Sequence, residues 1–138
     1  MYVIIGGGRS LPWRFEFETY LETLHAHCGF DEVIVGSNNR GHMGRRKGAD
    51  AHAKGWADRM GLDTTVMDAN WVAHGKGGGP RRNTRMLAYL LAMAAYDQRL
   101  VIAFPGGTGT ADLCMQARAL GMPVLCWPEL PPELDVAA

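Results

Sequence analysis

Short apolar runs alternate along this chain with stretches whose apolar residues recur every three or four positions. Runs of four or five apolar residues ended by Gly or Pro are typical of buried strands, and the three-to-four spacing is typical of amphipathic helices. We expect strands at residues 2–5, 33–36, 64–67, 100–104 and 124–127. Helices are expected at residues 13–28, 49–60, 80–94 and 110–120. This alternation predicts a single-domain α/β protein, a three-layer Rossmann-like fold with a mostly parallel five-stranded sheet.

The connections between these elements carry most of the glycine. Ligands of parallel sheets bind beyond the carboxyl ends of the strands, where the strand order reverses. Three glycine loops, residues 6–10, 36–48 and 105–110, should meet there. Residues 68–79 are predicted to form a fourth, glycine-laden loop. We place the domain at residues 1–128 and expect a loosely ordered tail at residues 129–138, which is rich in proline and ends in small residues.

Composition narrows the class of protein without identifying a partner. The 138 residues carry 47% hydrophobic and 20% charged side chains and a formal net charge of zero, so overall charge favours neither nucleic acid nor an anionic membrane. No apolar run is long enough to cross a membrane, and the start of the chain lacks a signal-peptide pattern. We therefore expect a cytoplasmic protein with no membrane partner. Its three widely spaced cysteines are expected to be reduced.

The segment at residues 105–110, Pro-Gly-Gly-Thr-Gly-Thr, lies between a predicted strand and a predicted helix. Such a turn directs free N–H groups toward a small space at the positive end of the helix, where a phosphate or carboxylate is stabilised. Glycine suits this turn because a Cβ would keep the backbone from the anion and would disfavour a positive φ. The hydroxyls of Thr108 and Thr110 add donors. The segment therefore predicts an anion site, although it would also serve as a plain strand-to-helix connection.

Charged residues near the predicted helix starts extend this site. Arg81 and Arg82 are adjacent on one helix, so only one of them can point toward the glycine loop and bind phosphate; Arg85 is expected at the surface. Asp50 lies in the first turn of a helix, where it either caps the helix or binds ribose hydroxyls. Asp112 has a similar position beside the 105–110 loop and is either a cap or a general base.

Several familiar site motifs are incomplete. The glycines after the first strand do not complete Gly-x-Gly-x-x-Gly, because the last position is Leu11. The Walker spacing is missing around Lys76, the five histidines show no metal-site spacing, and no Gly-x-Ser-x-Gly elbow is present. We therefore predict no resident cofactor and no metal.

The pattern as a whole resembles the SLOG superfamily of Rossmann-like nucleotide-binding proteins, and within it the YspA/YpsA-related branch, which is common in bacteria and phages. The resemblance covers nearly the whole chain. It is carried by residues 6–10, 48–50, 69–71, 75–76, 79–80, 82–83, Met86 and 104–110. It implies that a nucleotide-like ligand binds Gly7, Gly8, Arg9, Ser10, Asp50, Arg82, Asn83, Pro105, Gly106, Gly107, Thr108, Gly109 and Thr110.

The best-known relatives implied by this resemblance are the LOG phosphoribohydrolases, whose motif is Pro-Gly-Gly-x-Gly-Thr-x-x-Glu. Arg82 occupies their arginine position, but their glutamate position is Leu113 and the residue after the arginine is Asn83. Phosphate binding therefore transfers better than hydrolysis, for which Arg82 and Asp112 are the candidate catalytic residues.

Three functions follow from these patterns, in falling order. The first is a binding protein for a nucleotide or a nucleotide-derived ligand. The second is an enzyme that cleaves the N-glycosidic bond of a nucleoside 5′-monophosphate. The third, a single-stranded DNA binder using Arg40, Arg45, Arg46 and Lys47, is not favoured because that loop lacks a stacking aromatic. The resemblance also implies a homodimer, for which Leu87, Leu90 and Leu91 would supply apolar surface.

Overall fold

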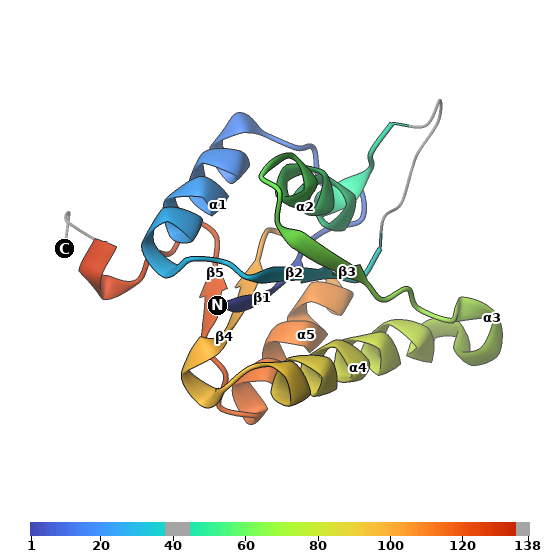
Figure 1. Cartoon of the computed structure of the whole chain (residues 1–138). Helices are drawn as coiled ribbons and strands as arrows, with labels where there is room; N and C mark the ends of the chain where they lie inside the picture. Colours follow the sequence, from blue (N-terminus) through green and yellow to red (C-terminus); the bar gives the residue numbers. More distant parts are fainter. Residues whose placement is uncertain (38–44, 135–138) are drawn as a thin grey trace.

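The computed structural model describes residues 1–37 and 45–134 and confirms the predicted α/β architecture (Figure 1). Five strands form one sheet in the order β3-β2-β1-β4-β5, and every neighbouring pair is parallel. Their bounds are Tyr2–Gly6 (β1), Glu32–Val35 (β2), Asp63–Val66 (β3), Arg99–Ala103 (β4) and Val124–Cys126 (β5). The order reverses between β1 and β4, which is where a fold of this kind leaves a crevice for a ligand.

Helices cover both faces of the sheet. In Figure 1, α1 (Phe15–Cys28) and α2 (Gly48–Arg59) lie on one face, and α4 (Gly78–Met93) and α5 (Thr108–Ala119) lie on the other. The predicted helices match these four to within two residues at their starts. Short 3-10 turns occur at Tyr96–Gln98 and Pro132–Leu134.

Alternation along the central strands explains the two-sided core. Val3 and Ile5 of β1 point into a cluster beneath α1 and α2 that contains Phe17 and Trp56, whereas Ile4 points into a cluster with α4 and α5. All of these side chains are at most 1% exposed. Successive side chains of a strand face opposite sides of a sheet, so a strand buried on both faces reads as a continuous apolar run.

The predicted loop at residues 68–79 is instead largely helical, which corrects the sequence expectation. Residues Trp71–His74 form the one-turn helix α3, residues Gly75–Gly77 form a 3-10 turn (η2), and α4 already begins at Gly78. Asn70 caps α3, because its side-chain oxygen accepts a hydrogen bond from the Ala73 N–H at 3.0 Å. Three glycines hid this helical turn from a reading based on apolar spacing.

The chain beyond β5 packs on the body of the protein as far as it is described. Leu130 and Leu134 lie against the core cluster under α1, and the Tyr20 hydroxyl donates to the Glu129 carbonyl oxygen at 2.5 Å. Residues 135–138 of the predicted loose tail lie outside the described residues.

The apolar surface assigned above to a dimer is mostly absent. Leu87 and Leu90 are 1% and 0% exposed within the single chain, and Leu91 alone of the three is exposed, at 39%. The helical spacing identified an apolar stripe on α4 correctly, but that stripe faces the chain's own sheet. A dimer remains a prediction without these two leucines.

Two smaller expectations concern thiols and membranes. The three cysteines are free, and Cys114 is buried. Within residues 1–37 and 45–134, none of the helices has both the length and the apolar character needed to cross a bilayer.

Candidate functional site

A cavity of about 1270 Å³ opens at the carboxyl edge of the sheet, beside the point where the strand order reverses. The three predicted glycine loops meet there. The Gly8 N–H donates to the Pro105 carbonyl oxygen at 2.8 Å, and the Ala49 N–H donates to the Gly8 carbonyl oxygen at 3.0 Å. These two bonds tie the loop after β1 to the loop after β4 and to the start of α2.

Close packing explains the glycines of the loop after β1. A Cβ on Gly7 would lie 2.6 Å from the Ala49 Cβ and 3.0 Å from the Phe104 Cβ. Gly48, at the start of α2, has a φ of +82° and contacts the backbone of Arg9. The glycines therefore allow three backbone segments to approach one another and form the floor of the cavity.

The loop at residues 105–110 leads directly into α5, with Gly107 as its N-cap and the first helical hydrogen bond from Ala111 N–H to the Gly107 carbonyl oxygen at 3.1 Å. The N–H groups of residues 108–110 precede that bond, so they have no partner within the helix. These residues and Gly107 line the cavity. The loop thus presents the free amides of a helix N-terminus to the cavity, as an anion site requires.

The predicted reason for the two glycines at positions 106 and 107 is wrong in part. Neither has a positive φ. Gly106 is required by space, because its Cβ would lie 2.8 Å from the Gly8 nitrogen and 2.9 Å from the Thr110 Cβ. Gly107 and Gly109 have open space around an added Cβ, so these two keep the approach to the amides clear.

Arg82 is the arginine that points toward the glycine loops. It lines the cavity, its Nη1 donates to the Gly36 carbonyl oxygen at 2.7 Å, and its Nε donates to the Asn83 Oδ1 at 3.0 Å. Burial lowers the pKa of Arg82, and the nearby Asp50 carboxylate opposes that shift. Two fixed hydrogen bonds hold the guanidinium at the end of β2, which prepares it to meet a ligand at little entropic cost.

Asn83 and Asp112 form a second fixed group on the opposite wall. The buried Asn83 donates through Nδ2 to the Gly109 carbonyl oxygen at 3.1 Å and to Asp112 Oδ2 at 3.0 Å. Gln116 Nε2 donates to the same Asp112 oxygen at 2.7 Å. Asp112 therefore links α4 to α5 and holds the loop after β4 in place, a structural role that sequence reasoning had weighed only as helix capping.

Asp50 is the carboxylate with the strongest electrostatic perturbation in the cavity. Burial raises its pKa from an ordinary 3.8 to about 7, and Asp68 adds to this rise. The charges of Arg82 and Arg9 and a hydrogen bond from the Gly36 backbone act in the opposite direction. Carboxylates with such pKa values cluster at functional sites, because burial and neighbouring charges are arranged there together.

Arg9 and Trp71 form a pair on the side of the cavity opposite α5's end of the sheet edge. The Arg9 guanidinium carbon lies 4.2 Å from the centre of a Trp71 ring. Both residues line the cavity, as do Lys47 and Lys76. Sequence reasoning named Arg9 but assigned no role to Trp71, Lys47 or Lys76 in ligand contact. Their signal was their position directly after strands or at helix starts on the carboxyl edge.

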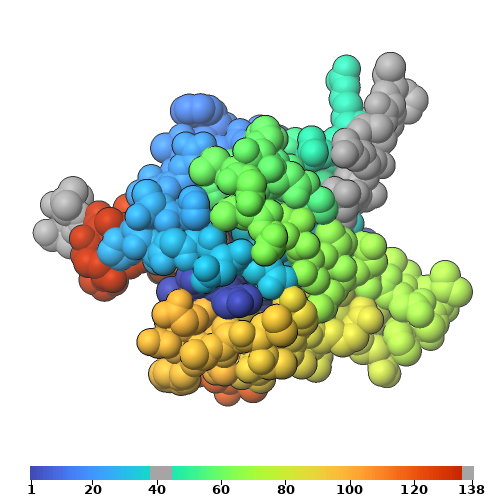
Figure 2. Space-filling model, in the orientation of Figure 1, coloured from blue at the N-terminus to red at the C-terminus, as the bar shows by residue number. Residues whose placement is uncertain are grey.

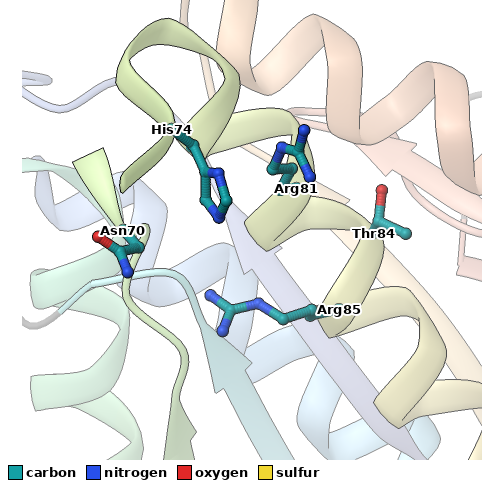
Figure 3. Close-up of a pocket in the computed structure, with 6 residues that line it drawn as sticks. Asn70, His74, Arg81, Thr84 and Arg85 are labelled. Atoms are coloured by element: carbon teal, nitrogen blue, oxygen red, sulfur yellow. The ribbon is translucent and has the colours of Figure 1, made fainter. Parts of the chain in front are cut away.

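Arg81 and Arg85 lie elsewhere, as the helical periodicity predicted for one of the adjacent arginines. They line a separate, smaller cavity of about 390 Å³ together with Asn70, His74 and Thr84 (Figure 3). In Figure 3 the Arg85 side chain extends from α4 toward Asn70, and its Nη2 donates to the Asp68 carbonyl oxygen at 2.7 Å. Arg85 thus ties α4 to the segment after β3.

The predicted basic loop is divided among different environments. Arg40 lies outside the described residues. Arg46 packs over Gly55 of α2, and its Nε is buried, Lys47 borders the cavity, and Arg45 is exposed. Since Arg46 is directed into the protein, the described part of this segment offers no continuous basic surface for a nucleic-acid strand.

Most of the sequence-predicted site residues line this one cavity. The exceptions are Pro105 and Gly106, which lie beneath it and shape the turn. Leu113, at the position of the LOG glutamate, is 2% exposed and packs in the core with Met86 and Ala117. In residues 1–37 and 45–134, no group of three or more His, Cys, Asp or Glu side chains is arranged to hold a metal ion. Comparisons with protein-family models, curated proteins and solved structures found no match.

Proposed function

We propose that this protein binds a nucleotide or a nucleotide-derived molecule and holds its phosphate on residues 107–110. The observation that carries the proposal is the convergence of three features on one cavity. These are the free amides at the start of α5, the fixed guanidinium of Arg82, and the loop after β1 with Arg9. Amides at a helix N-terminus and a rigid guanidinium are the groups that proteins use for phosphate.

The charge balance of the cavity supports an anionic ligand although the whole chain is neutral. Its lining carries four basic side chains, Arg9, Lys47, Lys76 and Arg82, and three acidic ones, Asp50, Asp68 and Asp112. Below a pH of about 7 Asp50 binds a proton, which leaves four positive charges against two negative charges. The volume of about 1270 Å³ exceeds the range of about 300 to 1,000 Å³ typical of small-molecule sites, so a nucleotide has room.

The two adjacent arginines provide a matched test. Arg82→Gln removes the charge that faces the glycine loops, and Arg81→Gln removes one from the same helix turn that faces the other cavity. Isothermal titration with the four common ribonucleoside 5′-monophosphates should show binding to the wild type and to Arg81→Gln. Arg82→Gln should bind at least tenfold more weakly, because charge-assisted hydrogen bonds to phosphate are worth about 1.5 to 3 kcal/mol. Equal weakening by both substitutions would contradict the assignment.

Hydrolysis of the N-glycosidic bond is a second candidate function, and Asp50 is the observation that favours it. A general acid or base works best when its pKa lies near the operating pH, and Asp50 meets this condition in the cavity. Asp112 is engaged by two amide donors, and the LOG glutamate position is buried as Leu113. In this reaction water adds to the anomeric carbon and the base leaves with a proton. Chromatographic detection of free base from each nucleoside monophosphate tests the reaction. Loss of release in Asp50→Asn, with retention in Asp112→Asn, would assign the proton transfer to Asp50.

Membership in the SLOG superfamily, in its YspA/YpsA-related branch, is part of the same proposal. It is supported by the position of the residues that carry the resemblance, since the loops at residues 6–10, 48–50 and 107–110 border one cavity. We also propose a homodimer on the basis of that resemblance, and light scattering of the purified chain tests it. A nucleic-acid partner is not favoured, because Arg46 is directed inward.

A further inference from the structure

Trp71 has a position that folding alone does not explain. It is 42% exposed, it belongs to neither core cluster, and none of residues 71–77 is buried. An indole left at the surface contributes little to stability, since the stabilisation by an apolar side chain scales with the area that it removes from water. Yet its ring borders the cavity that holds the glycine loops. Figure 2 shows the segment that carries it projecting at the side of the molecule.

The backbone beneath the ring fixes its place. A Cβ on Gly78 would lie 3.2 Å from Trp71 Cε3, and a Cβ on Gly79 would lie 3.2 Å from Cη2. Both glycines are therefore sites where the start of α4 accepts the indole at close range. Arg9 approaches the same ring, with its guanidinium carbon 4.2 Å from the centroid. The ring thus already accommodates a planar, cationic partner from the cavity.

Of the described residues that line the cavity, Trp71 is the sole aromatic one. The remaining lining consists of glycines, charged groups and small side chains, which suit a phosphate and a ribose but offer no flat apolar surface. A nucleobase has two π-faces, and stacking on an aromatic side chain is the usual way in which proteins hold one without reading its edges.

We propose that Trp71 is the platform on which the base of the bound nucleotide stacks, in the place that the Arg9 guanidinium occupies on the ring. The ligand class is then a nucleotide that retains its base, rather than a sugar phosphate or a free anion. This inference rests on the proposed function, because it takes the phosphate to lie on residues 107–110. Stacking tolerates any base, so Trp71 contributes affinity, and other contacts must choose between purine and pyrimidine.

The test compares ligands with and without a base. The four common ribonucleoside 5′-monophosphates are titrated into the wild type, the tightest is retained, and ribose 5-phosphate serves as the ligand without a base. Trp71→Ala should weaken the nucleotide by about 5-fold to 100-fold and leave ribose 5-phosphate unchanged. Trp71→Phe keeps a ring and should restore most of the affinity. Val72→Ala alters a fully exposed neighbour on the same helical turn and is the matched control.

The possible outcomes separate the two claims. If the wild type binds neither ligand, the proposed function fails, and this inference fails with it. If the wild type binds both ligands equally well, or if Trp71→Ala weakens both to the same degree or neither, the inference alone is wrong. Selective weakening of the nucleotide with rescue by Trp71→Phe supports it. A loss of native circular dichroism in Trp71→Ala would show a structural role for the ring and would overturn the assignment as a platform.

Discussion

Replacing Asp50 by asparagine should make the protein more stable at neutral and alkaline pH, even though it removes a charged group next to Arg82. The pKa of Asp50 is about 7 in the folded chain, against an ordinary value of 3.8. Below about pH 4 both the folded and the unfolded chain hold the proton, so this group causes no penalty there. As the pH rises through about 7, the folded state must give up its proton, and the stability tied to the neutral form is lost.

The size of the effect follows from the two pKa values. The difference between 3.8 and about 7, at about 1.4 kcal/mol for each pKa unit, corresponds to about 4 kcal/mol above neutral pH. Asp50 borders a cavity that water enters, and solvent screens its charge, so we expect a measured difference of about 1 to 3 kcal/mol. Asparagine retains the shape of the side chain and cannot ionise. The free energy of unfolding of Asp50→Asn should therefore exceed that of the wild type increasingly between about pH 5 and pH 8.

Urea unfolding at several pH values measures this difference directly, and Asp97→Asn, which removes an exposed carboxylate outside the cavity, is the matched control. Sulfate binding provides an independent measurement, because sulfate keeps its double charge throughout this pH range. The wild type should bind sulfate more weakly as Asp50 ionises, and Asp50→Asn should lose that part of the pH dependence. A stability difference that does not change with pH, or an Asp50→Asn variant that is less stable at about pH 8 than the wild type, would refute the reasoning.

The remaining predictions concern the glycines of the site. Gly7→Ala should reduce the free energy of unfolding by about 1 to 3 kcal/mol, because the added methyl meets Ala49 and Phe104. Gly109→Ala, whose methyl has open space in the first turn of α5, should be neutral or stabilising by up to about 1 kcal/mol in the same urea titration. Gly107→Val should fold with an unchanged melting temperature and lose sulfate binding, because its side chain covers the free amides. Gly77→Val, with the nearest atom 3.8 Å from its Cβ, is the control. A Gly107→Val variant that binds sulfate normally would exclude residues 107–110 as the anion site.

Local pattern was sufficient to predict the strands, the four long helices and the carboxyl-edge position of the glycine loops. Apolar runs such as residues 100–104 have one explanation when glycine and proline end them, and the topology of a parallel sheet then brings the loops together. The choice between Arg81 and Arg82 illustrates the limit. Periodicity shows that the two diverge, but the bond from Arg82 to the Gly36 carbonyl depends on the placement of β2 against α4.

Other features required the folded chain because they depend on contacts between distant residues. The burial of Asp50 among Arg82, Arg9 and Asp68 joins four segments, and no spacing in the sequence encodes it. The same holds for the bond between Asn83 and Asp112. Sequence reasoning also assigned Leu87 and Leu90 to a surface that they do not reach, since an apolar stripe on a helix does not specify what covers it.

The hydrogen bond between the Gly8 amide and the Pro105 carbonyl joins parts of the chain that are about as far apart in sequence as this protein allows. No contiguous fragment can then reproduce the cavity, because its walls come from both halves of the polypeptide and exist only after β1 and β4 have paired. Occupancy of the cavity therefore stabilises the entire fold against unfolding rather than one local segment. A rise in melting temperature on ligand addition would report the completion of the whole tertiary structure.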